Sequence, residues 1–340
     1  MLTVAWENNS VVLIDQTKLP NMLVYIKCTD YREVAEAIKK LVVRGAPAIG
    51  VTAAFGLALA AQASKAKTLL GLMTDLDTAF KVLRATRPTA VNLFWALERV
   101  MGKAKTAKTL KEVKKVVLDE ALKMSAEDIN ANRQIGANGA KLFRDGDIVL
   151  THCNAGSLAT VAYGTALGVI RAARESGKRL SVIATETRPV MQGSRLTAFE
   201  LQHDGIDVSL IPDTAVGHMM ARGMIKRVIV GADRVLRTGH VFNKIGTYQV
   251  AILASRHKVP FYVAAPLSTF DFESSPEDVV IEERSVEEVV RVGKKRVAPK
   301  GVRVFNPAFD MTPPELIMGI ITERGVLMPP FEKNLKALLG

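Results

Sequence analysis

Short apolar runs rich in β-branched residues alternate with helical patterns between residues 147 and 266 of this 340-residue sequence. Parallel strands cannot be joined by tight turns, so each successive pair needs a long crossover connection, which is usually a helix. The alternation therefore predicts a parallel sheet with helices on both faces. The expected strands are DIVLT (147–151), LSVIATE (180–186), DVSLIPD (207–213), RVIVGAD (227–233) and PFYVAAP (260–266).

Most of these runs end in a polar residue. The terminal residues are Thr151, Glu186, Asp213 and Asp233. In open α/β sheets, ligands bind beyond the carboxyl ends of the strands. We therefore expect the functional site in the loops that follow these four residues.

The first part of the chain is dominated by helical patterns after a short β start. VAWENNSVVLIDQ (4–16) alternates weakly and then becomes apolar, which is typical of a small sheet or hairpin. Helical spacing of apolar residues begins at Val34, and a second helix is expected to start at Pro47, because proline favours the first helical position. Further helices are expected over 70–84, 90–101, 108–124 and 126–143. The sequence thus predicts an α/β protein with a mostly helical N-terminal domain (1–124) and a C-terminal domain containing a parallel sheet (125–340).

Composition places the chain among soluble globular proteins. It is 48% hydrophobic and 24% charged. We expect no membrane span, because no apolar run approaches the roughly 18 residues that a span needs. The N-terminus lacks the pattern of a signal peptide. Two cysteines 125 positions apart form neither a disulfide framework nor a zinc cluster, so we expect a reducing, cytoplasmic compartment.

The formal net charge of +12 raises the question of nucleic-acid binding. The lysines of GKAKTAKTLKEVKKVV (102–117) have the spacing of an exposed helical face, and KKR (294–296) is a short isolated run. Aromatic residues make up only 6% of the chain and are not interleaved with either run, which is poor material for base stacking. We therefore expect no nucleic-acid partner, and only a mild preference for anionic ligands.

VRGAPAIGV (43–51) is a candidate phosphate site. Gly45 and Ala46 directly precede Pro47, so their amide groups would lie at the open end of a helix, with Arg44 beside them. Exposed amides, the positive end of the helix dipole and a guanidinium together suit a phosphate. The alternative is an ordinary helix N-terminus with a surface arginine.

Cys153 lies in THCNAGSLAT (151–160), just past a predicted strand. A helix expected over about 157–176 and closed by Gly177 would place the thiol near a helix N-terminus, which lowers a thiol pKa. The alternative is a buried filler, the commonest role of a lone cysteine. His152 is not expected to act as its base, because neighbouring side chains in extended chain point in opposite directions.

Asp233 ends the apolar run of GADRV (231–235), so its carboxylate would be directed into a site at the end of a strand. Apolar surroundings raise a carboxyl pKa and make the group a candidate acid or base. The alternatives are a helix cap or an ion pair with Arg234. NKIG (243–246) adds Asn243 and Lys244, and ETRPVMQGSRLTAFEL (186–201) adds Gln192 near the start of another helix.

Taken together, these residues describe a pocket at the strand ends with a thiol, a carboxylate, and amide and cationic donors. The sequence contains no P-loop, no GxGxxG after a strand, no serine triad and no set of metal ligands. Such a set suits proton transfer on a sugar phosphate better than redox chemistry or hydrolysis. We expect no metal and no other cofactor.

Six ordered blocks of the sequence resemble those of the methylthioribose-1-phosphate isomerases. The blocks are VRGAPAIG, ATRPTAVNLFWAL, THCNAGSLAT, ETRPVMQGSRLTAFEL, VGADRV followed by NKIGTY, and NPAFDMTPPELI. The resemblance as a whole runs from about residue 43 to residue 328. This family shares a superfamily with the α, β and δ subunits of translation initiation factor 2B. The resemblance implies a helical N-terminal domain, a Rossmann-like C-terminal domain and a homodimer.

The resemblance also implies a role for each matching residue. Cys153 and Asp233 match the catalytic pair. The positions that match substrate-binding residues are Arg44, Gly45, Ala46, Arg87, Gln192, Asn243 and Lys244. The implied reaction converts 5-methylthioribose 1-phosphate to the corresponding ketose, with Asp233 transferring a proton at the ring oxygen and Cys153 acting at C1 and C2.

Two alternatives remain at this level. The first is an isomerase of another sugar 1-phosphate, such as ribose 1,5-bisphosphate. A second phosphate would require a further cationic cluster, whereas FWAL (94–97) has no basic neighbour before Arg99. The second is a non-catalytic regulator like the factor 2B subunits, which generally lack the Cys and Asp pair.

Overall fold

The computed structural model describes residues 1–87 and 91–339, and the chain divides into two compact units. The first comprises Met1–Arg133 with Ala155–Gly168, and the second comprises Gln134–Asn154 with Val169–Gly340. The chain leaves the first unit within one long helix, α5 (Leu110–Ala140). The two helices expected over 108–124 and 126–143 are this single helix, because no glycine or proline interrupts it before residue 136. The domain boundary expected at 124/125 falls inside it.

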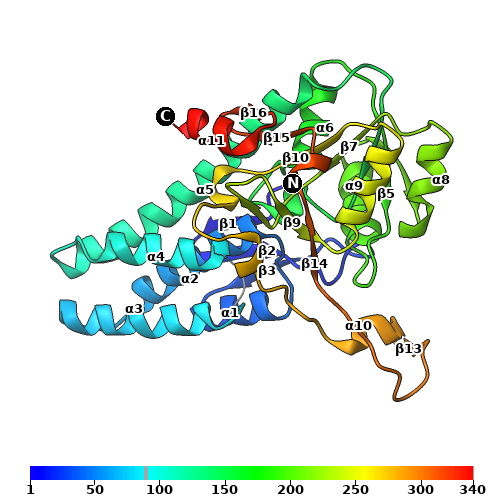
Figure 1. The fold of residues 1–340 in the computed structure, drawn as a ribbon. Helices are drawn as coiled ribbons and strands as arrows, with labels where there is room; N and C mark the ends of the chain where they lie inside the picture. Colours follow the sequence, from blue (N-terminus) through cyan, green and yellow to red (C-terminus); the bar gives the residue numbers. More distant parts are fainter. Residues whose placement is uncertain (88–90, 340) are drawn as a thin grey trace. The chain divides into compact units, whose positions relative to one another are not determined.

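The first unit contains a small antiparallel sheet and a group of helices (Figure 1). The strands are β1 (Val4–Glu7), β2 (Ser10–Ile14) and β3 (Tyr25–Cys28). The helices before α5 are α1 (Tyr31–Lys39), α2 (Ala46–Ala63), α3 (Leu69–Arg84) and α4 (Val91–Ala104). Helix α2 packs against the other three, so it forms the centre of this unit. The small β start and the helices predicted for this region are confirmed.

Helix α2 is apolar around its whole circumference, as expected of a helix enclosed by others. Among the described residues it is the one helix long and apolar enough to cross a membrane, with a mean hydropathy of 1.5. This corrects the expectation that no run approaches the length of a span. Burial accounts for the apolar composition of α2, because 78% of the helix lies inside the protein, as in the core helix of a soluble protein.

The second unit is built on a seven-stranded sheet with the order β16-β15-β10-β7-β4-β5-β6. All neighbouring pairs are parallel except β15 and β16. The strands are β4 (Ile148–Thr151), β5 (Ser181–Thr185), β6 (Asp207–Ile211), β7 (Arg227–Val230), β10 (Phe261–Ala264), β15 (Gly319–Thr322) and β16 (Gly325–Leu327). The five strands expected from the sequence are all present. The mixed α/β class with a parallel sheet is therefore confirmed.

The order of the strands creates a reversal at the centre of the sheet. The chain starts at β4, adds β5 and β6 on one side, and then returns to place β7 on the other side of β4. Connections leave β4 and β7 in opposite directions, so a crevice is expected between their carboxyl ends. Register confirms the contact, because Leu150 of β4 pairs with Val228 of β7.

The second unit also contains a four-stranded sheet with the order β11-β8-β9-β14. Along the chain, its strands are interspersed with those of the large sheet. The strands are β8 (Arg234–Leu236), β9 (Val241–Lys244), β11 (Phe270–Asp271) and β14 (Phe309–Thr312). A hairpin is formed by β12 (Arg291–Val292) and β13 (Lys295–Arg296). The helices are α6 (Ala166–Glu175), α7 (Ala198–His203), α8 (Val216–Ala221), α9 (Thr247–Arg256), α10 (Val286–Val290) and α11 (Phe331–Leu339).

The helix expected over 157–176 is wrong at its start. Residues Ser157–Ala159 form a 3₁₀ turn, and α6 begins only at Ala166. Tyr163 and Gly164 both adopt positive φ, at 72° and 85°, and a right-handed helix cannot pass through them. The predicted end is right, because Gly177 adopts a φ of 88° two residues after the helix.

Candidate functional site

Cys153 and Asp233 follow the two central strands of the parallel sheet. Cys153 lies two residues beyond β4, and Asp233 lies three residues beyond β7. Because β4 and β7 are neighbouring parallel strands, both residues lie at the same edge of the sheet, where the strand order reverses. Both are partly buried. The sheet therefore brings together the thiol and the carboxylate that the sequence singled out.

The backbone of Cys153 adopts a left-handed conformation, with φ at 64°. Such a φ is uncommon outside glycine, asparagine and aspartate, and it persists only where the surroundings impose it. Here both polar groups of the peptide are held by threonine hydroxyls. The N–H donates to Oγ1 of Thr187 at 2.9 Å, and the carbonyl accepts from Oγ1 of Thr197 at 2.6 Å. No α-helix starts directly after Cys153, so the expected influence of a helix N-terminus on this thiol is wrong.

His152 is buried, and its ring bonds to other groups of the second unit. Nδ1 lies 2.7 Å from Oγ1 of Thr185, and Nε2 lies 2.9 Å from the carbonyl oxygen of Ile245. Burial lowers the pKa of His152. The ring is therefore neutral and held by these two partners, which agrees with the expectation that it is not the base for Cys153.

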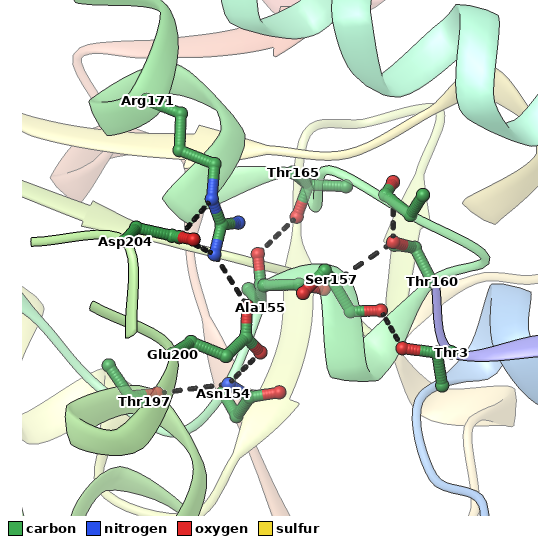
Figure 2. A network of polar contacts seen from close by, with 12 residues as sticks. Thr3, Asn154, Ala155, Ser157, Thr160, Thr165, Arg171, Thr197, Glu200 and Asp204 are labelled. Carbon is green, nitrogen blue, oxygen red and sulfur yellow. Dashed lines mark hydrogen bonds and ion pairs between the residues drawn. The ribbon is translucent and has the colours of Figure 1, made fainter. Parts of the chain in front are cut away.

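Asn154 connects the cysteine loop to a buried ion pair (Figure 2). Its Nδ2 donates to Oε1 of Glu200 at 3.0 Å and to Oγ1 of Thr197 at 3.2 Å. The other carboxylate oxygen of Glu200 lies 2.8 Å from Nη2 of Arg171, which also contacts Asp204. Glu200 is completely buried, so this pair anchors the loop from below the site.

Asp233 lies between β7 and β8. Its N–H donates to the carbonyl of Phe242 at 2.9 Å, which ties it to β9. A strand follows it, so the alternative in which Asp233 caps a helix is wrong. Arg234 forms an ion pair with Asp271 at 3.1 Å.

Asn243 and Lys244 end strand β9 and are both buried. Antiparallel pairing with β14 keeps both residues extended. Nδ2 of Asn243 donates to Oγ1 of Thr247 at 3.0 Å. Nζ of Lys244 donates to the carbonyl of Ala308 at 2.8 Å and lies 4.6 Å from the centre of the Phe309 ring. A buried ammonium held in this way is suited to an anionic ligand.

Asp310 is a neighbouring carboxylate that the sequence did not single out. It pairs with Asn243 across the strands, and it accepts from the N–H groups of Gly246 at 2.7 Å and Tyr248 at 3.1 Å. Burial raises its pKa to about 6, although these bonds and Lys244 act in the opposite direction. The block NPAFDMTPPELI contains it, but only the pairing of β9 with β14 places it here.

Gln192 begins the turn that leads into α7 and is buried. Its Oε1 has no hydrogen-bond partner among the described residues. The backbone around it is tightly packed. Met191 adopts a φ of 61°, and a Cβ on Gly193 would lie 1.7 Å from the carbonyl oxygen of Thr185. The side-chain amide is therefore buried on a tightly packed stretch of backbone.

Arg44, Gly45 and Ala46 belong to the first unit, as does Arg87. Gly45 directly precedes α2 and has a φ of 85°, and an added Cβ would lie 2.1 Å from the carbonyl oxygen of Ala159. Only glycine fits there. Within the described part of the chain, this helix start has no side-chain cap, as expected for an anion site. Arg44 and Arg87 are partly buried, and residues 88–90 of the ATRPTAVNLFWAL block lie outside the described residues.

Within residues 1–87 and 91–339, no group of three or more histidine, cysteine, aspartate or glutamate side chains could hold a metal ion. The functional groups described at this edge of the sheet are a thiol, carboxylates, side-chain amides and an ammonium group.

Comparison with known proteins places the chain in a family. The sequence model of the initiation factor 2 subunit family matches residues 42–329. A methylthioribose-1-phosphate isomerase of Fervidobacterium nodosum is 56% identical over 99% of this chain and 97% of that protein. A crystal structure described as 5-methylthioribose 1-phosphate isomerase from Pyrococcus horikoshii is 48% identical, with a TM-score of 0.94 over 99% of this chain and 95% of the other.

A second solved structure carries a different description. A protein of Archaeoglobus fulgidus described as translation initiation factor eIF-2B, subunit delta, is 52% identical, with a TM-score of 0.91 over 100% of this chain and 99% of the other. The fold and the site thus define a member of the initiation factor 2 subunit family. Within that family, the chain belongs with the methylthioribose-1-phosphate isomerases.

Proposed function

We propose that this chain isomerises 5-methylthioribose 1-phosphate, an aldose, to the ketose 5-methylthioribulose 1-phosphate in methionine salvage. The observation that carries the proposal is the pair Cys153 and Asp233 at adjacent strand ends of the sheet reversal. Opening of the sugar ring and hydrogen transfer from C2 to C1 are separate steps, and an acid or base near the substrate assists each of them. Identity of 56% to a protein named for this activity supports it.

The chemistry requires the ring to open before the carbons can exchange hydrogen. The phosphate on the anomeric carbon prevents the spontaneous opening that a free aldose undergoes. The bond between C1 and the ring oxygen breaks as that oxygen gains a proton. The C2 hydroxyl loses its proton and the hydrogen on C2 moves to C1, so C2 is oxidised to a ketone and C1 is reduced.

Each group has a proposed part in these steps. Asp233 transfers the proton at the ring oxygen, and Cys153 either transfers the proton between C2 and C1 or stabilises the charge that develops there. The tight support of the Cys153 backbone favours this assignment, because a group that moves a proton must be held within hydrogen-bond reach of it. General acid and base steps of this kind typically contribute about 10²–10⁴-fold each.

The remaining residues are proposed to bind substrate. Arg44 and the amides of Gly45 and Ala46 hold the phosphate at the start of α2, and Arg87 is a second cationic ligand. Gln192, Asn243 and Lys244 bind the sugar. The buried carbonyl oxygen of Gln192 supports its role, because within the described residues it has no hydrogen-bond donor and suits a sugar hydroxyl.

Finer features are part of the same proposal. The parallel strand order of the second unit supports a Rossmann-like catalytic domain. We also propose a cytoplasmic homodimer that acts on a small-molecule substrate and needs no cofactor.

One assay tests the activity. The protein is incubated with 5-methylthioribose 1-phosphate and formation of the ketose is followed, with ribose 1,5-bisphosphate as the competing substrate. We expect turnover of the first sugar. Turnover of the bisphosphate alone would overturn the proposed substrate. Cys153→Ser and Asp233→Asn should each lose most of kcat while the protein stays folded.

A regulatory role in translation is the second candidate, and the description of the Archaeoglobus fulgidus structure is the observation that favours it. The Cys153 and Asp233 pair favours the enzyme. Absence of turnover with both sugar phosphates would turn the assignment toward this candidate.

A further inference from the structure

A chain of hydrogen bonds connects the amide of Cys153 to the strand that carries Asn243 and Lys244. The N–H of Cys153 reaches Oγ1 of Thr187 at 2.9 Å, which lies 3.3 Å from Oγ1 of Thr185. Oγ1 of Thr185 lies 2.7 Å from Nδ1 of His152, and Nε2 of His152 reaches the carbonyl oxygen of Ile245. Residue 245 directly follows Lys244.

The direction of this chain follows from its two ends. A carbonyl oxygen only accepts, so Nε2 of the neutral ring carries the proton and Nδ1 must accept from Thr185. The Thr185 hydroxyl therefore donates its hydrogen to Nδ1 of His152. Its oxygen in turn accepts a hydrogen bond from the Thr187 hydroxyl. The oxygen of Thr187 is then left to accept from the N–H of Cys153. His152, Thr185 and Thr187, the three side chains between the two ends, each donate once and accept once, and the Thr187 hydroxyl has the carbonyl oxygen of Thr185, at 3.4 Å, as a second acceptor.

The backbone around Thr187 is held as firmly as its hydroxyl. Its N–H and that of Arg188 donate to the two carboxylate oxygens of Asp213, each at 2.7 Å. Thr187 is completely buried and adopts a φ of 61°. This value is a true outlier for a β-branched residue, and such outliers gather where a site needs one side chain in one place. The hydroxyl is therefore presented at a single position beneath Cys153.

We propose that Thr187 is the positioning residue of Cys153, and that His152 acts through Thr185 to orient its hydroxyl. The inference rests on the proposed function, in which Cys153 meets the reacting carbons. The left-handed turn at Cys153 sets where the thiol lies, and the bonds to Thr187 and Thr197 hold this turn. Loss of that bond displaces the thiol without removing any group that binds substrate.

A matched pair of variants tests this role. Thr187→Val keeps the shape and the β-branching of the side chain but removes the acceptor, whereas Thr187→Ser keeps the hydroxyl. We expect Thr187→Val to lower kcat by about 10- to 100-fold, the consequence of leaving a buried donor unsatisfied. KM should change by less than about threefold, because the substrate-binding groups remain. Thr187→Ser should recover most of kcat.

A second readout does not depend on activity. Amide hydrogen exchange of the peptide containing Cys153 should be at least about tenfold faster in Thr187→Val than in the wild type, and near wild type in Thr187→Ser. Unchanged exchange together with kcat within twofold of wild type would overturn the proposal. A wild-type protein without isomerase activity would defeat the proposed function, while the exchange comparison would still decide whether Thr187 holds Cys153.

Thr185→Val tests the next link and avoids the strained backbone of Thr187. It should show the same kcat loss in a weaker form, because Thr187 keeps its oxygen but loses its orienting partner. Combined with Thr187→Val, its effect should be much less than additive, since both changes break one chain. Fully additive losses would show that the two threonines act separately and would overturn the role given to His152 and Thr185.

Discussion

Cys28 and Cys153, the two cysteines of the chain, lie in different surroundings. Cys28 is almost completely buried, and burial, with the charge of Glu33 as a second cause, raises its pKa to about 11. It stays a neutral thiol at physiological pH, as expected of a core residue in the first unit. Cys153 is partly exposed at a strand end and is held by two threonine hydroxyls. Local environment, rather than residue type, separates structural from reactive cysteine.

Arg44 offers a test of phosphate binding at the start of α2. Replacement by alanine should raise KM by about tenfold or more while kcat changes little, because a phosphate is bound equally in the ground state and the transition state. Steady-state kinetics with 5-methylthioribose 1-phosphate measures both constants. Arg32→Ala, which changes an exposed arginine of the same unit, is the control and should leave both unchanged. A loss confined to kcat in Arg44→Ala would contradict the proposed role.

Glu200 tests the anchor beneath the cysteine loop. It is completely buried and pairs with Arg171 at 2.8 Å, so Glu200→Ala leaves a buried guanidinium with one carboxylate fewer. We expect the free energy of unfolding to fall by about 3–5 kcal/mol, measured by urea denaturation. The control is Asp119→Ala, which breaks an exposed pair with Lys115 and should cost no more than about 0.5 kcal/mol. Equal effects of the two variants would contradict the anchoring role.

At the scale of the element, α5 contains an acidic residue in unusual surroundings. Oδ2 of Asp128 accepts from the N–H of Val161 at 2.7 Å and from Nδ2 of Asn132 at 3.1 Å. Burial raises the pKa of Asp128 to about 7, although both bonds act to lower it. Between its ordinary value of 3.8 and this value, the folded protein keeps a proton that the unfolded chain releases. Its contribution to stability therefore falls as pH rises through this window.

Asp128→Asn should remove this pH dependence. The wild type should lose more unfolding free energy between about pH 5 and about pH 8 than the variant does, as measured by urea denaturation at both values. Asp119→Asn on the same helix lacks the buried setting and serves as the control. An identical pH dependence in Asp128→Asn and the wild type would show that Asp128 does not titrate in this range.

The segment from Ser157 to Gly164 shows how local backbone structure depends on contacts with distant parts of the chain. The 3₁₀ turn and the positive φ values between Ser157 and Gly164 replace the expected first turns of a helix. In the first unit, Oγ1 of Thr3 donates to the carbonyl of Ser157 at 2.7 Å, a contact over 154 residues of sequence (Figure 2). The pattern of apolar residues over a stretch of ten residues gives no information about a contact with such a distant part of the chain.

At the scale of the whole molecule, the resemblance to the family leads us to propose a homodimer. Light scattering on a size-exclusion column should give twice the 36.9 kDa of one chain. The result should hold across a wide range of protein concentration, because stable homodimers have large apolar interfaces. A mass of one chain at all concentrations would contradict this prediction.

The sequence by itself determined the class of the protein, because the spacing of apolar residues records which faces of strands and helices are buried. It also led to the prediction that the functional site lies in the loops at the strand ends and includes Cys153 and Asp233. The short strands of the second sheet were missed, since runs of two to four residues are too brief for a period to appear. The pairing of β9 with β14, and with it the place of Asp310, depends on residues 62 or more positions apart.

Only the tertiary structure decided that β4 and β7 are neighbours, because strand order depends on how crossovers pack and not on the pattern within a strand. Only the fold also reveals the left-handed backbone of Cys153. Its φ of 64° has no local cause in THCNAGSLAT and is imposed by hydroxyls of Thr187 and Thr197, 34 and 44 residues away. A sequence pattern indicates which residues are buried. Backbone strain at a site is instead sustained by contacts between parts of the chain that are far apart in the sequence.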